Sequence, residues 1–453
     1  MTETALDIAL SLQSALGKIV SLSPVAVNAT REDKSGHVSS SAPLAVVTPT
    51  TIEEVQALMR FASEHSIPVV TRGAGTGLAG GAIAGGGEIV LSTMKLNTIV
   101  EISTVDELAV VGPGVINGDL NDALRPLGYW FAPDPASRAI SSIGGNIATN
   151  AGGLLCAKYG VTREAVIGLS VVLADGRLIT TGHRTVKGVT GLDLTALMVG
   201  SEGTLGVIVE ATVRLRPLPQ GTVSTIGAFF PTAEAAARAA SVISASGTRP
   251  ALMELLDPQA MGTISRWLGV PVRDEAFLLV QTDGLGAHDE ASAALTTIRT
   301  LGGEAELTLD EAHSEELLAL RRSFHPAMAA NGTVLIEDVC VPRSALPAMF
   351  SAIDDIAARF DVTIATVAHA GDGNLHPNFV FDGDEIPEKV WDAAHEMFLT
   401  ALRLGGTLTG EHGVGILKKR WIEQELGTVQ LELQKDIKKV FDPLGILNPG
   451  KVF

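Results

Sequence analysis

Two histidines on either side of a glycine-rich stretch could bind one metal ion. Residues 363–382 hold two runs of alternating β-prone residues around Gly371–Asn374, and this pattern predicts a β-hairpin with those four residues as its loop. In that register His369 lies directly opposite His376, and Asn378 points to the same face. Two imidazoles on one face of paired strands can share a divalent cation. The simpler interpretation, two histidines satisfied by ordinary hydrogen bonds, stays open.

A third ligand could come from a second glycine-rich stretch, residues 405–415, which contains Glu411 and His412. Glycines allow the backbone to come close to another group. Glu411 would complete a set of two histidines and one carboxylate with an open coordination position. His412 would then act as a separate acid or base, since adjacent residues rarely bind the same ion. The alternative is a surface turn with an incidental acid.

Length and composition limit the kind of protein this can be. At 453 residues, of which 46% are apolar, the chain is expected to form two or three domains. Its net charge of −18 disfavours nucleic acid or an anionic membrane as a partner. The two cysteines, Cys156 and Cys340, exclude a disulfide framework and indicate a reducing, cytoplasmic compartment. We expect neither a signal peptide nor a transmembrane segment.

The elements that would position these residues follow an α+β pattern. We expect an N-terminal helix and loop over residues 1–38 and a mixed α+β domain over 39–218. From Thr222 onward strands and helices alternate, which predicts a second domain, 219–405, built on one antiparallel sheet with helices on one face. The last segment, 406–453, combines a helix with a tail rich in proline and glycine.

Local signals define some elements within these domains. Thr51 and Glu54 form a capping box ahead of a helix with apolar residues at helical spacing. Later in the chain, residues 314–329 predict one helix and residues 333–341 predict one strand.

Three glycine-rich stretches in the first half could hold a ligand against the backbone. Residues 72–81 match G-x-G-x-x-G after a predicted strand. A Rossmann unit would need a helix to begin there, but Gly85–Gly87 follow, and each glycine costs a helix about 1 kcal/mol. We therefore reject a Rossmann unit and expect a nest of N–H groups suited to a pyrophosphate, with a plain turn as the alternative. Residues 141–153 and 199–208 are expected to form two further loops against the same ligand.

Seven motifs in a fixed order resemble the FAD-linked oxidases of the vanillyl-alcohol oxidase and p-cresol methylhydroxylase (PCMH) type. They are RGAGTGLAGG, SSIGGNIATNAGG, KYGVTRE, GSEGTLGVI, HAGDGNLH, TGEHGVG and FDPLGILNPGKVF, and the match runs from about Pro43. Within that family the chain is similar to the D-2-hydroxyacid dehydrogenases, which include D-lactate dehydrogenase and the flavin subunit of glycolate oxidase. The resemblance implies a PCMH-type FAD-binding domain, an α+β cap domain and a C-terminal segment that returns to the flavin.

The resemblance also implies roles for individual residues. His369, His376 and Glu411 correspond to the ligands of a divalent metal, for which we expect zinc or manganese. His412 corresponds to the family's proposed base and Asn378 to a substrate contact. FAD is expected to be non-covalent, because no histidine lies where covalently flavinylated relatives attach it. The residues implied in FAD binding are Arg72, Gly73, Ala74, Gly75, Thr76, Gly77, Gly80, Pro133, Ser142, Gly144, Gly145, Asn150, Gly152, Gly153, Gly203, Val207 and Asn448.

The implied reaction is the oxidation of a D-2-hydroxyacid to its 2-oxoacid. A hydride passes from C2 to flavin N5, His412 takes the hydroxyl proton, and the metal assists this deprotonation. Arg321 and Arg322 are both candidates to bind the substrate carboxylate. Relatives that act on D-2-hydroxyglutarate carry a lysine near the position of Ile336, so D-lactate or glycolate is the expected substrate.

Alternatives and partners stay open at this point. Within the family, the alternatives are a D-2-hydroxyglutarate dehydrogenase and a flavin-binding subunit of a multi-subunit glycolate oxidase. Two further alternatives are an NADPH-dependent flavin reductase and a metal-dependent hydrolase. We expect an electron acceptor of unidentified type, and a homodimer or an iron–sulfur partner subunit as the assembly. Such an acceptor partner could bring a cytoplasmic protein to a membrane surface.

Overall fold

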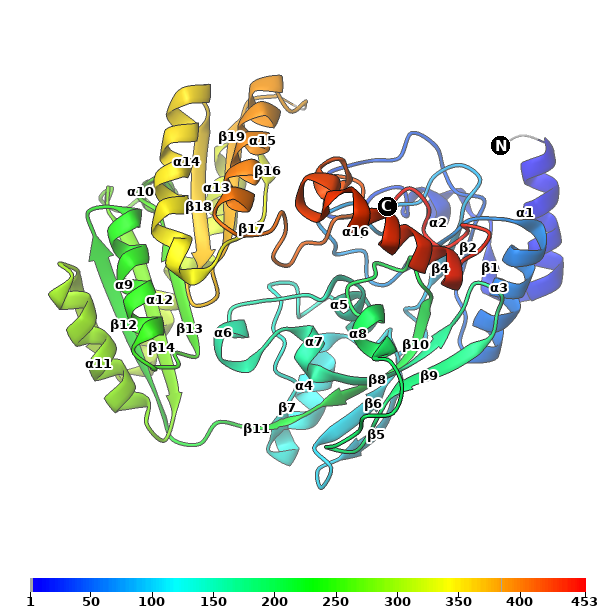
Figure 1. Ribbon diagram of the computed structural model, residues 1–453, viewed down its shortest axis with the longest axis horizontal. Helices are drawn as coiled ribbons and strands as arrows, with labels where there is room; N and C mark the ends of the chain where they lie inside the picture. The colour runs from blue at the N-terminus through cyan, green and yellow to red at the C-terminus, as the bar shows by residue number, and fades with distance from the viewer. Residues whose placement is uncertain (1–2, 384) are drawn as a thin grey trace. The chain divides into compact units, whose positions relative to one another are not determined.

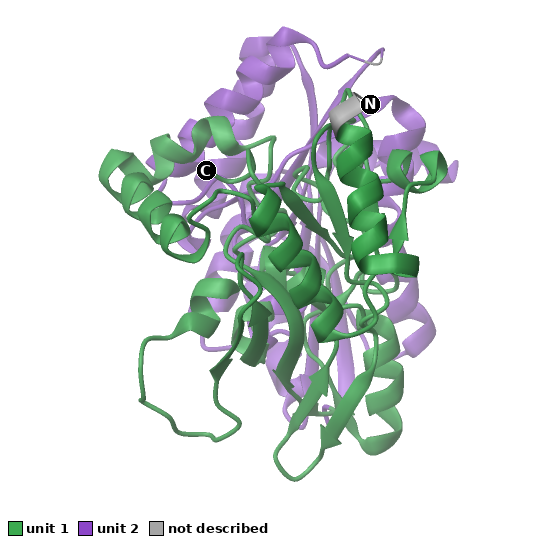
Figure 2. Ribbon diagram, turned by 90° about the vertical axis from the view of Figure 1, so that its right-hand side faces the viewer, with its two compact units in different colours: residues 1–152, 160–218, 411–453 green, residues 153–159, 219–410 purple. Residues whose placement is uncertain are grey.

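The computed structural model describes residues 3–383 and 385–453, and these form two compact units (Figures 1 and 2). Unit 1 combines the residues up to 152 with 160–218 and 411–453, and unit 2 combines 153–159 with 219–410. The domain boundaries expected from the sequence stay predictions.

Unit 1 contains a four-stranded sheet whose inner strands run parallel. Its strands, in order across the sheet, are β1 (Val20–Ser21), β2 (Ala45–Val47), β4 (Ile89–Ser92) and β3 (Val69–Arg72). β4 pairs in parallel with both β2 and β3. α3 (Ile52–His65) connects β2 to β3 and begins at the predicted capping box, in which the Thr51 hydroxyl accepts a hydrogen bond from the Glu54 N–H at 3.3 Å.

A second sheet in unit 1 has five strands, and neighbouring strands are antiparallel. In order they are β5 (Ile99–Ser103), β6 (Leu108–Val111), β10 (Val207–Arg214), β8 (Val166–Val172) and β9 (Leu178–Gly182). The other elements of unit 1 are α1 (Glu3–Leu16), η1 (Gly17–Ile19), α2 (Pro24–Asn28), α4 (Asn117–Leu124), η2 (Arg125–Leu127), β7 (Tyr129–Trp130), α5 (Ile143–Thr149), α7 (Thr162–Ala165), α8 (Leu194–Met198), β11 (Arg216–Pro217), η4 (Lys419–Trp421) and α16 (Ile422–Phe441).

The C-terminal segment completes the first sheet of unit 1. The Val69 N–H donates to the Ile446 carbonyl at 2.7 Å, and the Asn448 N–H donates to the Val69 carbonyl at 2.9 Å. Ile446 and Leu447 are buried in the same core cluster as Val69 and Ile89. The chain end therefore returns to this part of the protein, as the sequence predicts.

Unit 2 is built on one eight-stranded antiparallel sheet, which confirms the predicted sheet type. Its strands are β15 (Glu304–Thr308), β12 (Thr222–Phe230), β14 (Ala276–Gly284), β13 (Leu252–Leu256), β18 (Thr363–His369), β19 (Asn374–Phe381) and β16 (Thr333–Ile336), with β17 (Val339–Cys340) also on β19. Its helices are α6 (Cys156–Tyr159), α9 (Ala233–Ala245), α10 (Pro258–Leu268), α11 (Ala287–Thr300), α12 (Glu311–Arg322), α13 (Phe324–Asn331), η3 (Arg343–Ala345), α14 (Leu346–Phe360) and α15 (Glu388–Arg403).

Helices cover both faces of this sheet, whereas the sequence analysis expected helices on one face. All residues of the central strand β13 are buried, so neither face of the sheet is open to water there. Leu252 and Leu256 pack in one core cluster with residues of α10 and α13. α14 contacts both α9 and α15, and α9 contacts β12, β13 and β14.

Two predicted elements of unit 2 are interrupted. The predicted helix 314–329 is divided at Ser323 into α12 and α13. The predicted strand 333–341 is divided at Glu337 and Asp338, which lie between β16 and β17 and are both buried. The helical spacing does not reveal the first break, whereas the two consecutive acids interrupt the apolar run at the second.

The predicted hairpin is present, but its predicted register was wrong. His369 pairs with Asn374, and His376 pairs with Val367. The Gly373 N–H donates to the His369 carbonyl at 3.0 Å, and Gly373 has a φ of 94°, so the turn closes one residue earlier than predicted. The resulting shift between the strands is two residues, which preserves the alternation of side chains. Both histidines therefore still point to one face of the hairpin.

Residues 153–159 pack in unit 2, although the chain on both sides of them belongs to unit 1. Lys158 Nζ lies 2.5 Å from Asp283 Oδ1. The Tyr159 hydroxyl donates to Asp283 Oδ2 at 2.6 Å. One carboxylate in β14 thus binds two consecutive side chains of α6.

Asp257 joins α10 to strand β18 of the hairpin. Its Oδ1 accepts a hydrogen bond from the Ala260 N–H at 2.6 Å, and its Oδ2 accepts one from the Thr366 N–H at 2.7 Å. Burial raises the pKa of this carboxyl to about 7, and the nearby Asp354 acts in the same direction.

Stability should therefore depend on Asp257 between about pH 4 and 7. The unfolded carboxyl ionises near 3.8, whereas the folded one keeps its proton up to about 7. Over that range only the folded state holds the proton, so the stabilisation is fully present at low pH and is lost as pH rises through 7. We expect the urea midpoint of the wild type to fall over this range relative to that of Asp257→Asn. A constant difference between the two proteins would contradict the raised pKa.

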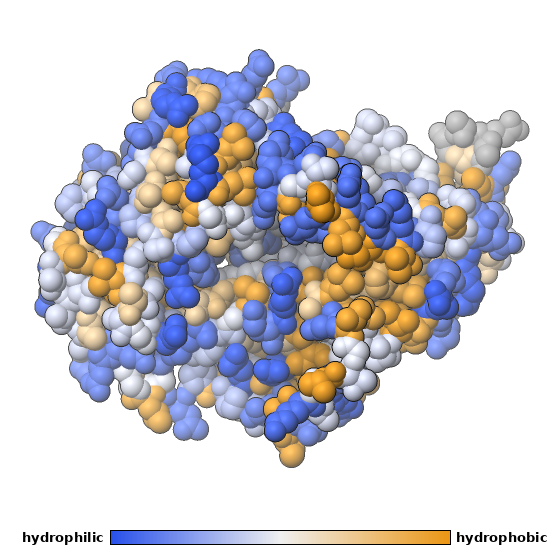
Figure 3. Space-filling model, viewed as in Figure 1, coloured by the Kyte–Doolittle hydropathy of each residue, from blue (hydrophilic) through white to orange (hydrophobic). Residues whose placement is uncertain are grey.

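Exposed apolar side chains lie along α16, the last helix of unit 1, and just beyond its end. Val429, Leu433, Val440 and Leu444 are each more than half exposed, and Figure 3 shows hydrophobic residues in the region of this helix. α16 is interrupted at Gly427, which has a φ of 70°. Among the described residues, no helix combines the length and the apolar character needed to cross a membrane.

Candidate active site

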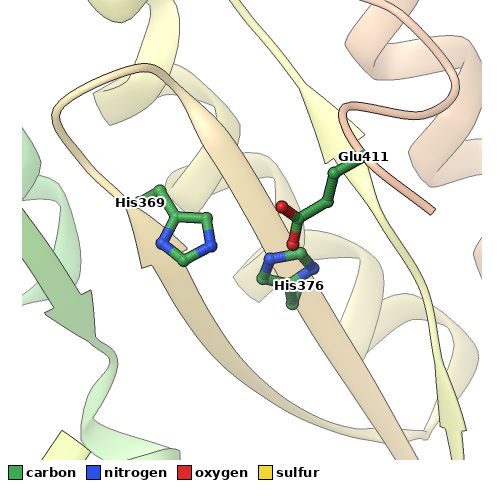
Figure 4. Close-up of side chains that lie close together, drawn as sticks. All are labelled: His369, His376 and Glu411. Atoms are coloured by element: carbon green, nitrogen blue, oxygen red, sulfur yellow. The ribbon is translucent and has the colours of Figure 1, made fainter. Parts of the chain in front are cut away.

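His369, His376 and Glu411 come together in the folded chain. Each offers one ligand atom, and these atoms lie within 4.8 Å of one another (Figure 4). The centroids of the two imidazole rings are 5.1 Å apart, and both histidines are buried. Two imidazole nitrogens and one carboxylate oxygen suit zinc or a divalent transition metal with an open coordination position. The residues present therefore fit the expected metal, which itself stays a prediction.

Glycine at position 410 allows the segment that carries Glu411 to approach the hairpin. A Cβ at Gly410 would overlap the side chain of Asn374 in β19. The preceding Thr409 donates its hydroxyl hydrogen to Asp338 Oδ2 at 2.6 Å. Both contacts fix the backbone immediately before the candidate ligand.

The loop that carries His412 is held on its other side by Glu202. The carboxylate of Glu202 accepts hydrogen bonds from the Val414 and Gly415 N–H groups at 2.7 and 2.9 Å. Burial raises the pKa of Glu202 to about 7, although these two hydrogen bonds act in the opposite direction. His412 is half-buried, so it can exchange protons with a ligand or with water.

Each histidine of the candidate metal site has a buried carboxylate near its Nδ1 atom. Glu254 Oε1 lies 2.6 Å from His369 Nδ1, and Asp338 Oδ1 lies 3.9 Å from His376 Nδ1. The contact with Glu254 favours Nε2 of His369 as its metal-binding nitrogen, whereas 3.9 Å is too long for a hydrogen bond to His376. Burial alone would raise the pKa of Glu254, but its interactions with His369 and Arg321 hold it below its usual value.

The two candidate arginines lie in different environments. Arg321, in the last turn of α12, is buried, and its Nε donates to Glu254 Oε2 at 2.6 Å. Arg322 forms an ion pair with Glu315, and 54% of its side chain is exposed. Arg321 therefore lies beside the candidate metal ligand His369, and Arg322 belongs to the exposed surface of the helix.

Two residues on neighbouring strands lie on the same face as the histidines. Asn378 is fully buried, and its Nδ2 donates to the His376 carbonyl at 2.9 Å. Its Oδ1 is buried without a hydrogen-bond partner among the described residues, a state that a bound ligand would relieve. Ile336 in β16 is the cross-strand partner of Asn378, so its side chain points to that face.

The first glycine-rich stretch forms a loop between β3 and β4, and none of its described residues is helical, so the rejection of a Rossmann unit is confirmed. The Arg72 guanidinium donates to a backbone carbonyl across this loop at 2.9 Å. Gly75 and Gly80 have left-handed φ values of 70° and 79°. A Cβ at Gly73 would overlap the Ser142 hydroxyl, so the first stretch contacts the second. The same loop holds Ala74, Thr76 and Gly77.

The second stretch forms a short helix, α5, and the expectation of a loop was wrong. Ser142 caps this helix by accepting a hydrogen bond from the Gly145 N–H at 3.3 Å, and Asn150 ends it with a φ of 52°. A Cβ at Gly144 would overlap Pro113, so this glycine serves close packing. Of the remaining candidates, Pro133 is buried, Gly152 ends the first segment of unit 1 and Gly153 begins unit 2.

The third stretch brings Gly203 beside Thr71 and Asn448. A Cβ at Gly203 would lie 3.6 Å from the Thr71 Cβ and 3.8 Å from Asn448 Nδ2. Asn448 Nδ2 donates to the Glu202 carbonyl at 2.7 Å. The Thr71 hydroxyl and Asn448 Oδ1 are buried without partners among the described residues, so unit 1 has polar groups that fit a ligand such as FAD. Val207 is different, because it is buried in the hydrophobic core of unit 1.

Glu254 and Asp338 are site residues that sequence reasoning missed. Each interrupts an otherwise apolar run, LMELL at 252–256 and TVLIEDVCV at 333–341. An acid within a run that reads as a buried strand needs a buried partner, because an unpaired charge there is costly. That signal was available in the sequence.

Comparison with protein families defines the class of this chain. Residues 43–182 match the FAD binding domain, so the chain is a flavoprotein oxidoreductase. Residues 220–452, more than half of the chain, match the C-terminal domain of FAD linked oxidases. The chain belongs to the FAD-linked oxidase family, and the prediction of FAD as its cofactor is confirmed.

Curated relatives cover nearly the whole chain. It is 43% identical to glycolate oxidase subunit GlcD of Bacillus subtilis over 422 residues, which are 91% of this chain and 89% of that protein. It is 38% identical to D-lactate dehydrogenase of Archaeoglobus fulgidus over 415 residues, which are 90% of each chain.

Solved structures confirm the predicted fold. A crystal structure of p-cresol methylhydroxylase with bound substrate has a TM-score of 0.81 at 17% identity and covers 100% of this chain and 97% of that one. A 4-ethylphenol oxidase from Gulosibacter chungangensis has a TM-score of 0.79, also at 17% identity. The α+β, PCMH-type fold is therefore shared.

Proposed function

We propose that this chain oxidises a D-2-hydroxyacid with a small side chain, D-lactate or glycolate, to the 2-oxoacid. The observation that carries the proposal is the group of residues at one face of the unit 2 sheet: the two histidines, Asn378 and the apolar Ile336 on its strands, with Arg321 from α12. The relatives named as a D-lactate dehydrogenase and as a glycolate oxidase subunit support this substrate class.

Each residue has a proposed role in handling the substrate. Arg321 uses Nε for Glu254, which leaves its terminal N–H groups to bind the substrate carboxylate. His412 takes the proton of the substrate hydroxyl as general base. Asn378 orients the substrate through its unpaired amide oxygen. When bound, FAD supplies the hydride acceptor, and a divalent metal on His369, His376 and Glu411 lowers the pKa of a coordinated hydroxyl.

Anaerobic mixing with a panel of D- and L-2-hydroxyacids tests this proposal. D-lactate or glycolate should bleach the absorption of the oxidised flavin, and L-lactate should not. Bleaching by none of the 2-hydroxyacids would reject the reaction class. Turnover of the isolated chain with an artificial acceptor also separates a self-sufficient dehydrogenase from a flavin subunit that needs a partner. We further propose that FAD is dissociable, which precipitation of the protein with acid and analysis of the supernatant would test.

Ile336 should set a preference for monocarboxylic substrates. Its apolar side chain shares a face with Asn378, and a second carboxylate buried there without a partner would cost several kcal/mol. A loss of ~3 kcal/mol corresponds to about a hundredfold in specificity. We expect kcat/KM for D-lactate or glycolate to exceed that for D-2-hydroxyglutarate by about this factor, and Ile336→Lys to narrow the gap. A wild-type preference for the dicarboxylate would reject this prediction.

A further inference from the structure

We propose that Glu254 is a positioning residue that fixes His369 and Arg321 at the same time and so couples metal binding to substrate binding. Glu254 contacts neither ligand itself. The proposal deepens the proposed function, since it rests on His369 as a metal ligand and on Arg321 as the group that binds the substrate carboxylate.

The two oxygens of Glu254 have separate partners. Oε1 lies 2.6 Å from His369 Nδ1, and Oε2 lies 2.6 Å from Arg321 Nε. The exposed fraction is 0% for Glu254, 5% for His369 and 8% for Arg321, so water does not compete for these contacts. Both bonds are charge-assisted, which makes them stronger than neutral hydrogen bonds.

The sheet itself sets the contact between Glu254 and His369. Glu254 in β13 is the direct cross-strand partner of His369 in β18. Directly paired residues on antiparallel strands point to the same face, so the register brings the carboxylate to the imidazole. Arg321 reaches the second oxygen from α12, which extends from Glu311 to Arg322.

This arrangement determines what each partner can present to a ligand. A carboxylate accepts hydrogen bonds but donates none, so His369 must carry its proton on Nδ1 and present the lone pair of Nε2. Arg321 has one donor committed to Glu254, which fixes the plane of its guanidinium. Release of either partner would allow it to rotate away from the position that its ligand requires.

Replacement of Glu254 by glutamine removes one of its two accepting oxygens at nearly constant volume. Its amide has one accepting oxygen and one donating nitrogen. When the oxygen accepts from Arg321, the NH2 group faces His369 and favours the tautomer with its proton on Nε2. When the oxygen accepts from His369, the NH2 group faces Arg321, and two donors meet. Glu254→Gln must therefore disturb one of the two partners.

Zinc affinity provides a measurement that does not depend on turnover. Competition with a chromophoric chelator, on the FAD-loaded protein, should give a dissociation constant about 10–100-fold weaker for Glu254→Gln than for the wild type. The matched control is Glu315→Gln on α12, which removes the partner of the exposed Arg322 and should leave zinc affinity unchanged. For the acid that bleaches the flavin best, KM should rise more in Glu254→Gln than in the control. Unchanged zinc affinity and unchanged KM in a folded Glu254→Gln would overturn the proposal.

The histidine tautomer tests the same inference without a metal and without a substrate. In 15N-histidine-labelled, metal-free wild type, His369, assigned through His369→Ala, should carry its proton on Nδ1. A proton on Nε2 with none on Nδ1 would overturn the proposal even where Glu254→Gln does not fold. A different result would separate the two proposals. If His369 has the expected tautomer but His369→Ala binds zinc as tightly as the wild type, the proposed metal site is wrong, whereas the positioning of His369 by Glu254 is supported.

Discussion

Replacement of His369 by alanine is expected to remove the bound divalent metal and to lower turnover by more than about a hundredfold while FAD is retained. His376→Ala and Glu411→Gln should behave in the same way, because the ligand atoms of all three residues lie within 4.8 Å of one another. Loss of a residue that only orients a ligand costs about 10–100-fold in affinity or activity, so loss of a ligand should cost more. Metal content by mass spectrometry, flavin absorbance and kcat with an artificial acceptor measure the three properties separately.

A histidine away from this group provides the control for that series. His313 on α12 contacts Glu306 and Glu316 at the surface, and 35% of its side chain is exposed. His313→Ala should keep metal, FAD and turnover. Unchanged metal content in all three ligand variants would rule out the metal site.

The second large effect is expected on FAD affinity, from a substitution at Gly77 in the first glycine-rich loop. The nearest atom to a Cβ built there is Asp33 Oδ2 at 3.8 Å, so the fold itself can accommodate Gly77→Val. A branched side chain would nevertheless prevent a pyrophosphate from approaching the N–H groups of the loop. FAD affinity should therefore fall by at least about tenfold, or 1.4 kcal/mol. Fluorescence titration of the apoprotein with FAD gives the dissociation constant.

Gly286 offers a matched substitution for this experiment. A Cβ at Gly286 would also lie 3.8 Å from a carboxylate oxygen, that of Glu290, and the residue is exposed at the start of α11 in unit 2. Gly286→Val should bind FAD as the wild type does. Equal FAD affinity in both variants would exclude the first loop from the flavin site.

The hairpin shows how much of the candidate site the sequence could predict. Strict alternation fixed the shared face of His369 and His376, and a shift of two residues cannot change that face. The loop position was less determined, because several consecutive residues of Gly371–Asn374 tolerate a positive φ. Only the folded turn, in which Gly373 has a φ of 94°, selects among them.

Long-range partners lie beyond what local patterns contain. Glu254 and His369 are 115 residues apart in the chain and meet because β13 and β18 are neighbours in the sheet. Periodicity predicts that both segments are strands but does not give the strand order. The same limit applies to Arg321 and Arg322, since helical spacing did not show which of the two arginines faces the sheet.

The return of the C-terminus to β3 has a consequence for the order in which the protein can fold during synthesis. β3 is an edge strand, and the residue that bridges to Val69 is Leu447, six residues before the end of the chain. Almost all of unit 2, by contrast, is one continuous segment, 219–410, preceded by 153–159. On the ribosome the core of unit 2 can therefore close first, while β3 at the edge of the N-terminal sheet stays uncovered until residues 446–448 have been synthesised. A truncation at the C-terminus would consequently damage the beginning of the chain.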